Sequence, residues 1–383
     1  MTQSNLGTTA LARDAYVSEE WHRKDLHAIW HQRWLFAGHA SQISKAGDFT
    51  SYDLAGSANV LIVRGRDGQV RAFHNVCRHR GARLCAEKSG TVKRNFVCQY
   101  HAWSYGPDGS LTGAPKMPES FDKSQWGAKP VWCEIWNGLI FINMSESRPP
   151  SVAEELAEAD LSIYQLDKTK VVKDVEYVFE CNWKLLAENF YECYHCAMNH
   201  PELCRTIIPD ANLDVVAPVP QANPTQSLLF AADASESFKP GVRSMTMDGD
   251  YAVKRLLGDP ADPPTTMTQM AWFPAFQING HPDWFLTESW RPLSPTKSVF
   301  RATWIVHEDA VEGVDYSYED VVKVHSETLQ QDTVLMSRVG AGVESDFYVP
   351  GPMHPGLEHG TQQFIETYLA TIEAYEADAK QSS

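Results

Sequence analysis

Two short segments, each with one cysteine and one histidine, constrain this chain more than any other feature of its sequence. The first is Cys77-x-His79, and the second, Cys98-x2-His101, follows after 18 intervening residues. Both segments lie at the ends of expected strands, where hairpin loops can bring them together. Two thiolates and two imidazoles, one of each from either loop, suit a centre of soft metal ions.

The arrangement of these ligands separates the candidate metals. A zinc finger usually pairs cysteine with cysteine and histidine with histidine, whereas here each segment supplies one of each. In a Rieske [2Fe–2S] centre two cysteines hold one iron and two histidines the other. We therefore predict that Cys77, Cys98, His79 and His101 hold a Rieske cluster, which suits an electron relay. A structural zinc site remains the alternative.

A second group of possible ligands is expected on a helix that begins after the N-cap residue Asn182 and runs to about Met198. Within this range Glu188, Glu192 and His195 are four and three residues apart, which places them on one face of the helix.

Another histidine follows at the expected end of the helix. His195 and His200 are five residues apart and cannot share a helical face, but Pro201 disfavours the helical conformation of the residue before it. Two histidines at a helix end, together with a distant carboxylate, form the two-histidine, one-carboxylate triad of non-haem Fe(II) enzymes. Asp332, in an expected helix, is the candidate for this carboxylate.

The same segment offers a rival interpretation. The spacing Cys193-x2-Cys196-x3-His200-x3-Cys204 is similar to a zinc knuckle. In a continuous helix Cys193 and Cys204 would lie about 16 Å apart along the axis, too far to share one ion. The knuckle therefore requires a sharp bend in the chain.

With both groups of ligands in view, the chain resembles the oxygenase (α) subunit of Rieske non-haem iron oxygenases from about residue 18 to 375. The specific parts are Cys77-Arg-His79-Arg-Gly-Ala, Cys98-Gln-Tyr-His101-Ala-Trp-Ser-Tyr, Asn182-Trp-Lys, Glu188-Asn189, Glu192-x2-His195-x4-His200-Pro and Gln331-Asp332. The resemblance implies an α+β fold. An N-terminal all-β Rieske domain would precede a helix-grip catalytic domain, in which an antiparallel sheet wraps on a long helix.

The hydrophobic pattern gives the expected domain boundaries. An N-terminal arm and helix cover residues 1–40, the Rieske domain covers 41–145, and the catalytic domain covers 152–383 after a Pro- and Ser-containing linker. Helices are expected at 18–38, 152–163, 317–338 and 358–378, and catalytic-domain strands at 171–180, 228–232, 270–278, 285–291 and 299–307.

The resemblance also implies roles for individual residues. His195, His200 and Asp332 would bind the ferrous ion, and Asn189 would lie near it as a polar neighbour or weak ligand. Glu192 stands where many members carry a bridging Asp. Electrons in this family cross a subunit interface, so a homotrimer is expected.

Sequence around the iron ligands is similar to one subgroup of this family. Residues 192–196, Glu-Cys-Tyr-His-Cys, resemble oxygenases of quaternary ammonium compounds such as carnitine, choline and glycine betaine. The expected reaction is O2-dependent hydroxylation that leads to N-demethylation or C–N cleavage. An aromatic-ring dioxygenase or aryl-ether O-demethylase with the same metals remains the alternative.

A quaternary ammonium group has no hydrogen to donate, so aromatic faces should recognise it through cation–π contacts. The candidate substrate contacts are Tyr191, Tyr194, Trp272, Phe276, Trp284 and Trp290.

Composition and charge limit the possible partners. The formal net charge of −16 excludes the basic footprint of nucleic-acid or anionic-membrane binding. The chain has no apolar run long enough for a spanning helix and no visible secretory signal, so we expect a cytoplasmic protein with reduced cysteines. It has no dinucleotide fingerprint or P-loop, and we therefore expect a separate NAD(P)H-dependent reductase that carries flavin and an iron–sulfur cluster.

Overall fold

The computed structural model describes residues 9–156, 159–209, 228–233, 238–265 and 267–381. These residues fall into two compact units, one of residues 32–152 and one that combines the N-terminal residues to His31 with residues 153–383. Among the described helices, none is long and apolar enough to cross a membrane.

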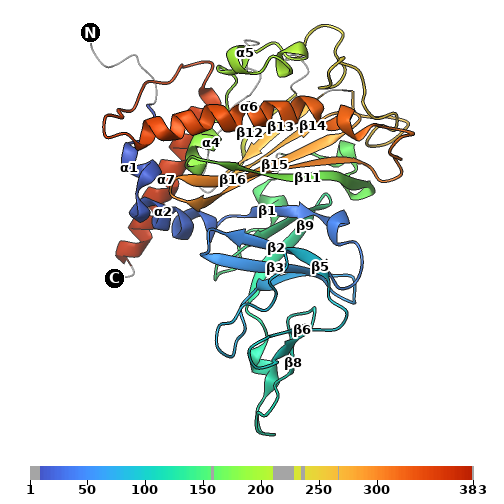
Figure 1. Ribbon diagram of the computed structural model, residues 1–383, viewed down its shortest axis with the longest axis vertical. Coiled ribbons are helices and arrows are strands. Elements are labelled where there is room, and N and C mark those ends of the chain that lie inside the picture. The colour runs from blue at the N-terminus through green and yellow to red at the C-terminus, as the bar shows by residue number, and fades with distance from the viewer. Residues whose placement is uncertain (1–8, 157–158, 210–227, 234–237, 266, 382–383) are drawn as a thin grey trace. The chain divides into compact units, whose positions relative to one another are not determined.

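The unit of residues 32–152 is built from antiparallel strands, as predicted (Figure 1). Its larger sheet has the order β1 (Leu35–His39), β10 (Leu139–Asn143), β9 (Pro130–Trp136), β4 (Val70–His74), β3 (Ala58–Arg64), β2 (Asp48–Leu54) and β5 (Ser89–Thr91). The smaller sheet consists of β6 (Phe96–Val97), β7 (Ser104–Tyr105) and β8 (Leu111–Gly113). A hairpin turn at Asp67-Gly68 joins β3 to β4, and Gly68 supplies the positive φ of +80° that this turn requires.

The other unit contains a second antiparallel sheet with the order β11 (Thr169–Phe179), β16 (Lys297–His307), β15 (Phe285–Ser294), β14 (Phe276–Gly280), β13 (Thr268–Trp272) and β12 (Leu228–Asp233). The predicted strand at 270–278 is in fact the two strands β13 and β14. Pro274 lies in the turn between them, where its missing N–H breaks no ladder.

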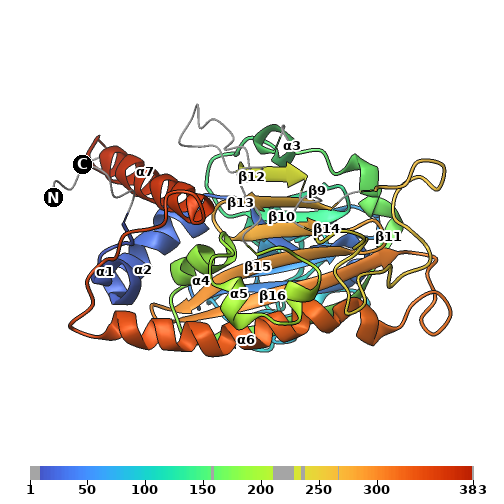
Figure 2. The same ribbon diagram turned by 90° about the horizontal axis from the view of Figure 1, so that it is seen from above.

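Helices α4 (Trp183–Phe190) and α6 (Tyr318–Glu344) lie against this sheet, and α7 (His359–Gln381) packs on α4 (Figures 1 and 2). The buried side chains of α6 recur every three or four residues along its length, which gives one face toward the sheet. At Gly340 a Cβ would lie only 2.4 Å from the Glu180 carbonyl, so glycine permits α6 to approach the end of β11. The predicted helix-grip arrangement is confirmed.

The shorter elements of this unit are α1 (Arg13–Val17), α2 (Glu19–Asp25), the π-helix η1 (Leu26–Trp30), α3 (Val152–Glu155) at its boundary, the 3-10 turns η4 (Ser162–Tyr164) and η5 (Leu166–Lys168), α5 (Cys196–Asn199) and η6 (Leu203–Arg205). The 3-10 turns η2 (Ala40–Ile43) and η3 (Lys123–Trp126) belong to the other unit.

Two expected helices outside the metal-ligand segments are shorter than predicted. The helix expected over 18–38 ends at Trp30, and residues 35–39 form β1 instead, because they pair with distant β10 and are buried at every position. Local periodicity does not reveal such a long-range partner. The helix expected over 152–163 ends already at Glu155.

A buried carboxylate connects the N-terminal helices to the rest of their unit. Asp25, which is fully buried, accepts hydrogen bonds from Trp183 Nε1 at 3.0 Å and Tyr368 Oη at 2.9 Å, and it also pairs with the Lys184 ammonium. Burial lowers the pKa of Lys184, and the Asp25 charge opposes that shift. The Asn182-Trp-Lys motif therefore joins α2, α4 and α7 around the Asp25 carboxylate.

Replacing Asp25 with Ala should lower the free energy of unfolding by about 3–5 kcal/mol, because it leaves the Lys184 ammonium buried without a partner. Denaturant unfolding followed by circular dichroism measures this change. Lys24→Ala, which removes the neighbouring surface pair with Glu376, is the control and should leave the transition almost unmoved. Coincident transitions for Asp25→Ala and the wild type would contradict this role.

Candidate metal centres

The two Cys/His segments of the β-unit form a matched pair of tight turns. In each, the cysteine N–H donates to the carbonyl five residues on, and the cysteine carbonyl accepts from the N–H four residues on, with all four distances between 2.7 and 2.9 Å. The residue four positions after Cys77 is Gly81 (φ +75°), and the one after Cys98 is Ala102 (φ +57°). Both turns thus pass through the left-handed region that a compact loop requires.

These turns separate the thiols from the imidazoles. Cys77 and Cys98 are buried, with 3% and 2% of their surface exposed, and both adjoin Tyr105, whose hydroxyl lies 3.5 Å from Cys77 Sγ. His79 and His101 are exposed, and their ring centroids lie 4.6 Å apart. Two buried sulfurs and two adjacent surface imidazoles fit a cluster with one iron inside and one at the surface.

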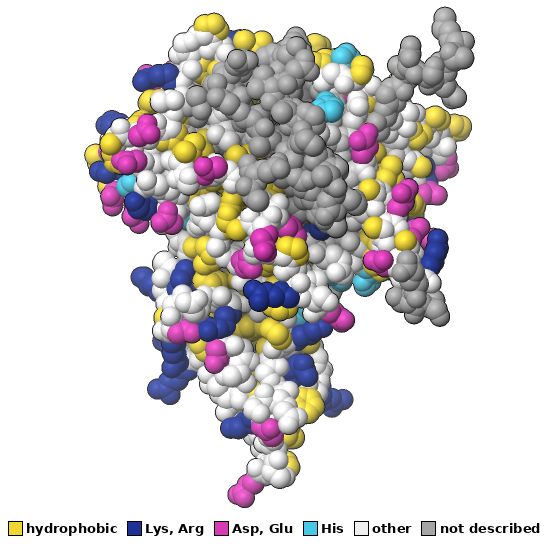
Figure 3. All heavy atoms as spheres, turned by 180° about the vertical axis from the view of Figure 1, so that it is seen from behind, with side chains coloured by type: hydrophobic (Ala, Val, Ile, Leu, Met, Phe, Trp, Pro, Cys, Tyr) yellow, Lys and Arg dark blue, Asp and Glu magenta, His cyan; other side chains and the backbone are white. Residues whose placement is uncertain are grey.

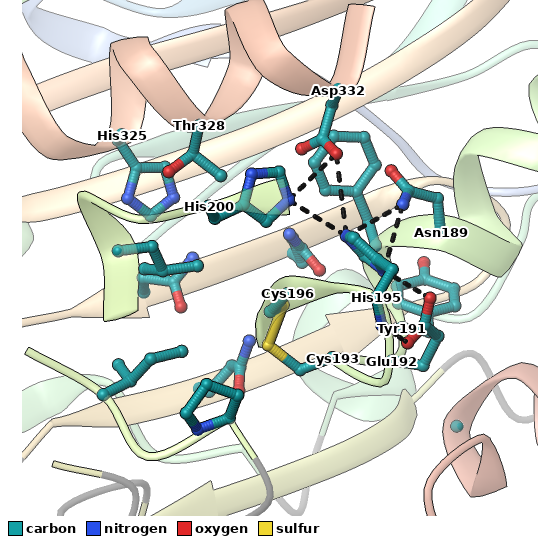
Figure 4. A pocket seen from close by; sticks show the side chains of 18 of the residues that line it. Asn189, Tyr191, Glu192, Cys193, His195, Cys196, His200, His325, Thr328 and Asp332 are labelled. Atoms are coloured by element: carbon teal, nitrogen blue, oxygen red, sulfur yellow. Dashed lines mark hydrogen bonds and ion pairs between the residues drawn. A yellow bond between two sulfur atoms is a disulfide. The ribbon is translucent and has the colours of Figure 1, made fainter. Parts of the chain in front are cut away.

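The second group of ligands comes together in the other unit (Figure 4). His195 Nε2 lies 3.1 Å from His200 Nε2, and Asp332 Oδ1 lies 3.6 Å and 3.1 Å from these two nitrogens. Asp332 is only 2% exposed, and its Oδ1 has no hydrogen-bond partner among the described residues. A buried carboxylate oxygen that faces two imidazole nitrogens fits a metal-ion site.

Both imidazoles are oriented by acceptors at their other nitrogen. His195 Nδ1 lies 2.5 Å from Glu192 Oε1, and His200 Nδ1 lies 2.9 Å from Gln331 Oε1. Gln331 in turn donates to Glu202 Oε2 at 2.6 Å, which fixes the orientation of its amide. With Nδ1 protonated in each ring, the Nε2 lone pairs are directed toward the space beside Asp332.

The charges at this site compensate one another. Burial lowers the pKa of His195, but the Asp332 and Glu192 carboxylates outweigh burial and raise it to about 9. Burial raises the pKa of Asp332, but the two imidazoles bring it below its ordinary value. The site therefore favours a positive charge between its ligands, which a divalent ion supplies.

The helix expected to reach Met198 ends at Phe190 instead, so the predicted common face is wrong. Glu192 turns the chain, because its Oε2 accepts the backbone N–H groups two and three positions on. Glu188 consequently points away from the metal ligands and accepts the Tyr16 hydroxyl at 2.7 Å. Burial raises the pKa of Glu188 to about 7.

Asn189 lies where the sequence placed it, beside the histidine ligands. Its Nδ2 is 3.1 Å from His195 Nε2, and its buried Oδ1 has no partner among the described residues. The amide is therefore close enough to contact a ligand of the metal ion.

The structure contradicts the zinc-knuckle interpretation. Cys193 and Cys196 form a disulfide, which also contradicts the expectation of reduced cysteines here. The sulfur of Cys196 lies near the two imidazoles, but a disulfide sulfur is not a thiolate ligand. Cys204 is not part of this disulfide, and its Sγ donates a hydrogen bond to the Cys196 carbonyl at 3.5 Å.

One cavity contains the three metal-site residues, and its walls combine apolar and polar side chains. Apolar lining residues include Phe190, Tyr191, Leu203, Ile207, Met245, Met267 and Leu329. Polar lining residues that the sequence analysis missed include Gln269, Gln277, Asn279, Glu288, His325 and Thr328. The polar alternation Gln277-Ile-Asn279 inside an apolar strand was the available sequence signal.

Of the six aromatic residues predicted to contact substrate, Tyr191 lines this cavity and the other five do not. Tyr194 is exposed, whereas Trp272 stacks on Phe276, Trp284 stacks on His281 and Trp290 stacks on Phe300. These strand aromatics therefore pack against other rings, and the described cavity lining contains the aromatic residues Phe190 and Tyr191.

Comparison with known proteins identifies both units. Residues 33–130 match the Rieske [2Fe-2S] domain, and residues 166–374 match the ring hydroxylating alpha subunit (catalytic domain). The glycine betaine monooxygenase oxygenase subunit of Pseudomonas aeruginosa is 34% identical, over 96% of this chain and 90% of its own length. The carnitine monooxygenase oxygenase subunit of Acinetobacter pittii is 33% identical, over 58% of this chain and 60% of its own length.

The fold has a solved counterpart. A quaternary ammonium Rieske monooxygenase, studied for carnitine oxidation and inter-subunit electron transfer, superposes with a TM-score of 0.76, 21% identity and 95% coverage of both chains.

Replacing Gln331 with Leu should weaken Fe(II) binding about 10- to 100-fold, because His200 Nδ1 loses the acceptor that orients its ring. Competition with a chromogenic ferrous chelator measures the affinity, and the visible absorption of the cluster serves as an internal reference. Gln330→Leu, at the exposed neighbouring position, is the matched control. Equal iron retention by the two variants would show that Gln331 does not orient the ligand.

Proposed function

Because the chain belongs to the ring-hydroxylating oxygenase alpha-subunit family with an N-terminal Rieske domain, we propose that it is the oxygenase component of a Rieske monooxygenase for quaternary ammonium compounds. The convergence of His195, His200 and Asp332 on one buried point carries this proposal. The proposed reaction hydroxylates a carbon next to the ammonium nitrogen, and collapse of the product gives N-demethylation or C–N cleavage.

The metal centres divide between the two units. Cys77 and Cys98 would hold one iron of the Rieske cluster, and His79 and His101 the other. The mononuclear site of His195, His200 and Asp332 would hold Fe(II). When bound, the cluster would supply single electrons and the ferrous ion would supply O2 activation. In the overall reaction one oxygen atom enters the C–H bond, and the other leaves as water with two electrons and two protons.

The protein positions the reactants. Glu192 and Gln331 keep the two Nε2 lone pairs directed at the ion, and Asn189 provides a polar contact beside it. Tyr191, the buried aromatic residue of the cavity wall, offers a ring face for the ammonium group. The apolar lining limits the access of water to the reacting carbon.

The aromatic-ring alternative is disfavoured by the cavity wall. The carboxylate of Glu288 lines the cavity and is almost fully buried, with an exposed fraction of 1%. A hydrocarbon ring cannot hydrogen-bond to this group or balance its charge, whereas an ammonium compound contributes a positive charge.

A single-turnover experiment tests the proposed reaction without a reductase. Protein reduced chemically, freed of reductant and mixed with O2 should convert choline or glycine betaine to formaldehyde, or to a C–N cleavage product, in an amount close to the mononuclear iron present, because one reduced cluster and one Fe(II) together hold the two electrons of one turnover. Asp332→Ala should give no product while its cluster spectrum is unchanged. Turnover of aromatic acids alone, or normal turnover by Asp332→Ala, would reject the proposal.

We further propose that electrons pass between copies of the chain, in a homotrimer that receives them from an NAD(P)H-dependent flavin and iron–sulfur reductase. His101 is exposed, and the residues 32–152 carry 15 Lys and Arg against 9 Asp and Glu, although the chain as a whole has 33 against 49. Many Lys and Arg side chains are visible on the surface (Figure 3). A basic cluster-bearing unit is complementary to the acidic unit of a second copy.

Mixing two inactive variants tests this route. His101→Ala lacks a cluster ligand, and His195→Ala lacks an iron ligand, so each alone should be inactive. Mixed assemblies formed by co-expression should recover a measurable fraction of wild-type turnover. In them the intact cluster of a His195→Ala copy can pass electrons to the intact iron site of a His101→Ala copy. Turnover that stays at the level of the single variants would indicate transfer within one chain.

A further inference from the structure

A patch of polar side chains interrupts the apolar inner face of the six-stranded sheet that runs from β11 to β12. Gln277 on β14 lies directly opposite Glu288 on β15, and Asn279 on β14 lies directly opposite Gln269 on β13. These four side chains all line the cavity that contains the metal-site residues. Buried polar groups on adjacent strands are costly unless they bind one another or a ligand.

Glu288 is the charged centre of this patch. Its Oε2 accepts hydrogen bonds from Gln277 Nε2 and Asn279 Nδ2, both at 2.8 Å. Its Oε1 accepts no hydrogen bond from the described residues, although His325 Nε2 lies 3.3 Å away. The carboxylate is therefore held firmly by one oxygen and left with acceptor capacity on the other.

The patch holds a second buried acceptor without a partner. Because Gln277 donates its Nε2 to Glu288, its amide orientation is set, and the buried Oε1 has no partner among the described residues. The buried Nδ1 of His325 likewise has no hydrogen-bond partner among the described residues. Unpaired buried acceptors call for a ligand that brings hydrogen-bond donors.

This patch lies at some distance from the metal ligands along α6. His325, Thr328 and Asp332 are spaced three and four residues apart and line the same cavity (Figure 4). Seven residues of α-helix span about 10 Å, so the carboxylate beside His325 is well removed from the iron site. A substrate whose reacting carbon lies at the iron would direct its opposite end toward Glu288.

We propose that Glu288, supported by Gln277 and Asn279, binds a hydrogen-bond donor at the end of the ammonium substrate that lies away from the iron. The donor is a hydroxyl or protonated amine, and a substrate carboxylate is disfavoured because it would meet a buried like charge. This inference rests on the proposed function and narrows it to ammonium alcohols or diamines.

Choline and glycine betaine test the proposal as a matched pair, because they share a trimethylammonium group and differ in a hydroxyl against a carboxylate. Calorimetric titration of the anaerobic, iron-loaded protein measures both dissociation constants. We expect the wild type to bind choline at least about tenfold more tightly. Glu288→Gln should bring the ratio close to one, whereas Glu288→Asp should retain the preference for choline.

Glu176→Gln is the control, because it neutralises a surface carboxylate on β11 of the same sheet that does not line the cavity. Its dissociation constants should equal those of the wild type. If Glu288→Gln does not unfold cooperatively, the Glu288→Asp variant provides the test. Wild-type affinity of that variant for both compounds would overturn the inference. Weaker binding of choline, with the preference for choline retained, would support it.

The outcomes separate this inference from the proposed function. Equal wild-type affinity for the two compounds, unchanged in Glu288→Gln, would overturn the role of Glu288 and leave an ammonium oxygenase. Absence of binding by both compounds, with binding of aromatic acids, would reject the proposed function itself.

Discussion

A single buried carboxylate connects the elements that carry the candidate iron site. Asp25 is enclosed by an ammonium, an indole N–H and a phenol hydroxyl, contributed by Lys184, Trp183 and Tyr368. Such a group is stable in the interior only while its donors stay in place. The position of α4, which leads directly into the metal ligands, is therefore coupled to the N-terminal α2 and the C-terminal α7.

The metal ligands follow α4 within a few residues along the chain. α4 ends at Phe190, and Glu192 folds the following segment back by accepting backbone N–H groups while its other oxygen orients His195. One carboxylate thus shapes the loop and prepares the ligand. The Cys193–Cys196 disulfide closes the same loop around His195. α6 then contributes Asp332, whose Oδ1 lies beside both imidazole nitrogens.

The sequence was most informative where chemistry depends on residue type and spacing. The Cys/His pairs at 77–79 and 98–101 predicted the all-β unit, and the segment from Glu192 to His200 with Asp332 predicted the group that the structure brings together. Their roles as ligands remain proposals. The helix-grip fold followed from the resemblance that these motifs carried.

Long-range pairing and local competition explain what the sequence did not reveal. Residues 35–39 form a strand because a segment about 100 residues later pairs with them, which local periodicity cannot show. α4 is short because a side chain competes with the backbone for its N–H groups. Glu288 was missed because a single polar residue in a buried strand has no motif, and its meaning depends on neighbours from β14 and α6.

The cavity has two regions that suit the two ends of the proposed substrate. Near the metal ligands its wall is shaped by Tyr191 and apolar side chains, which suit methylated nitrogen. Farther along α6 it presents the acceptors of Glu288 and Gln277, which suit a donor. A small ammonium compound with two different ends would satisfy both regions at once, whereas a uniformly apolar ligand would leave the buried Oε1 of Glu288 without a donor.

The most direct test of this account is anaerobic electron paramagnetic resonance of the reduced protein, with nitric oxide as the probe of a mononuclear ferrous site. The account predicts a ferrous nitrosyl signal that changes when a quaternary ammonium compound is added and that is missing in Asp332→Ala. A signal that responds only to aromatic acids would contradict the proposed substrate class. No nitrosyl signal in iron-loaded wild-type protein would contradict the iron site itself.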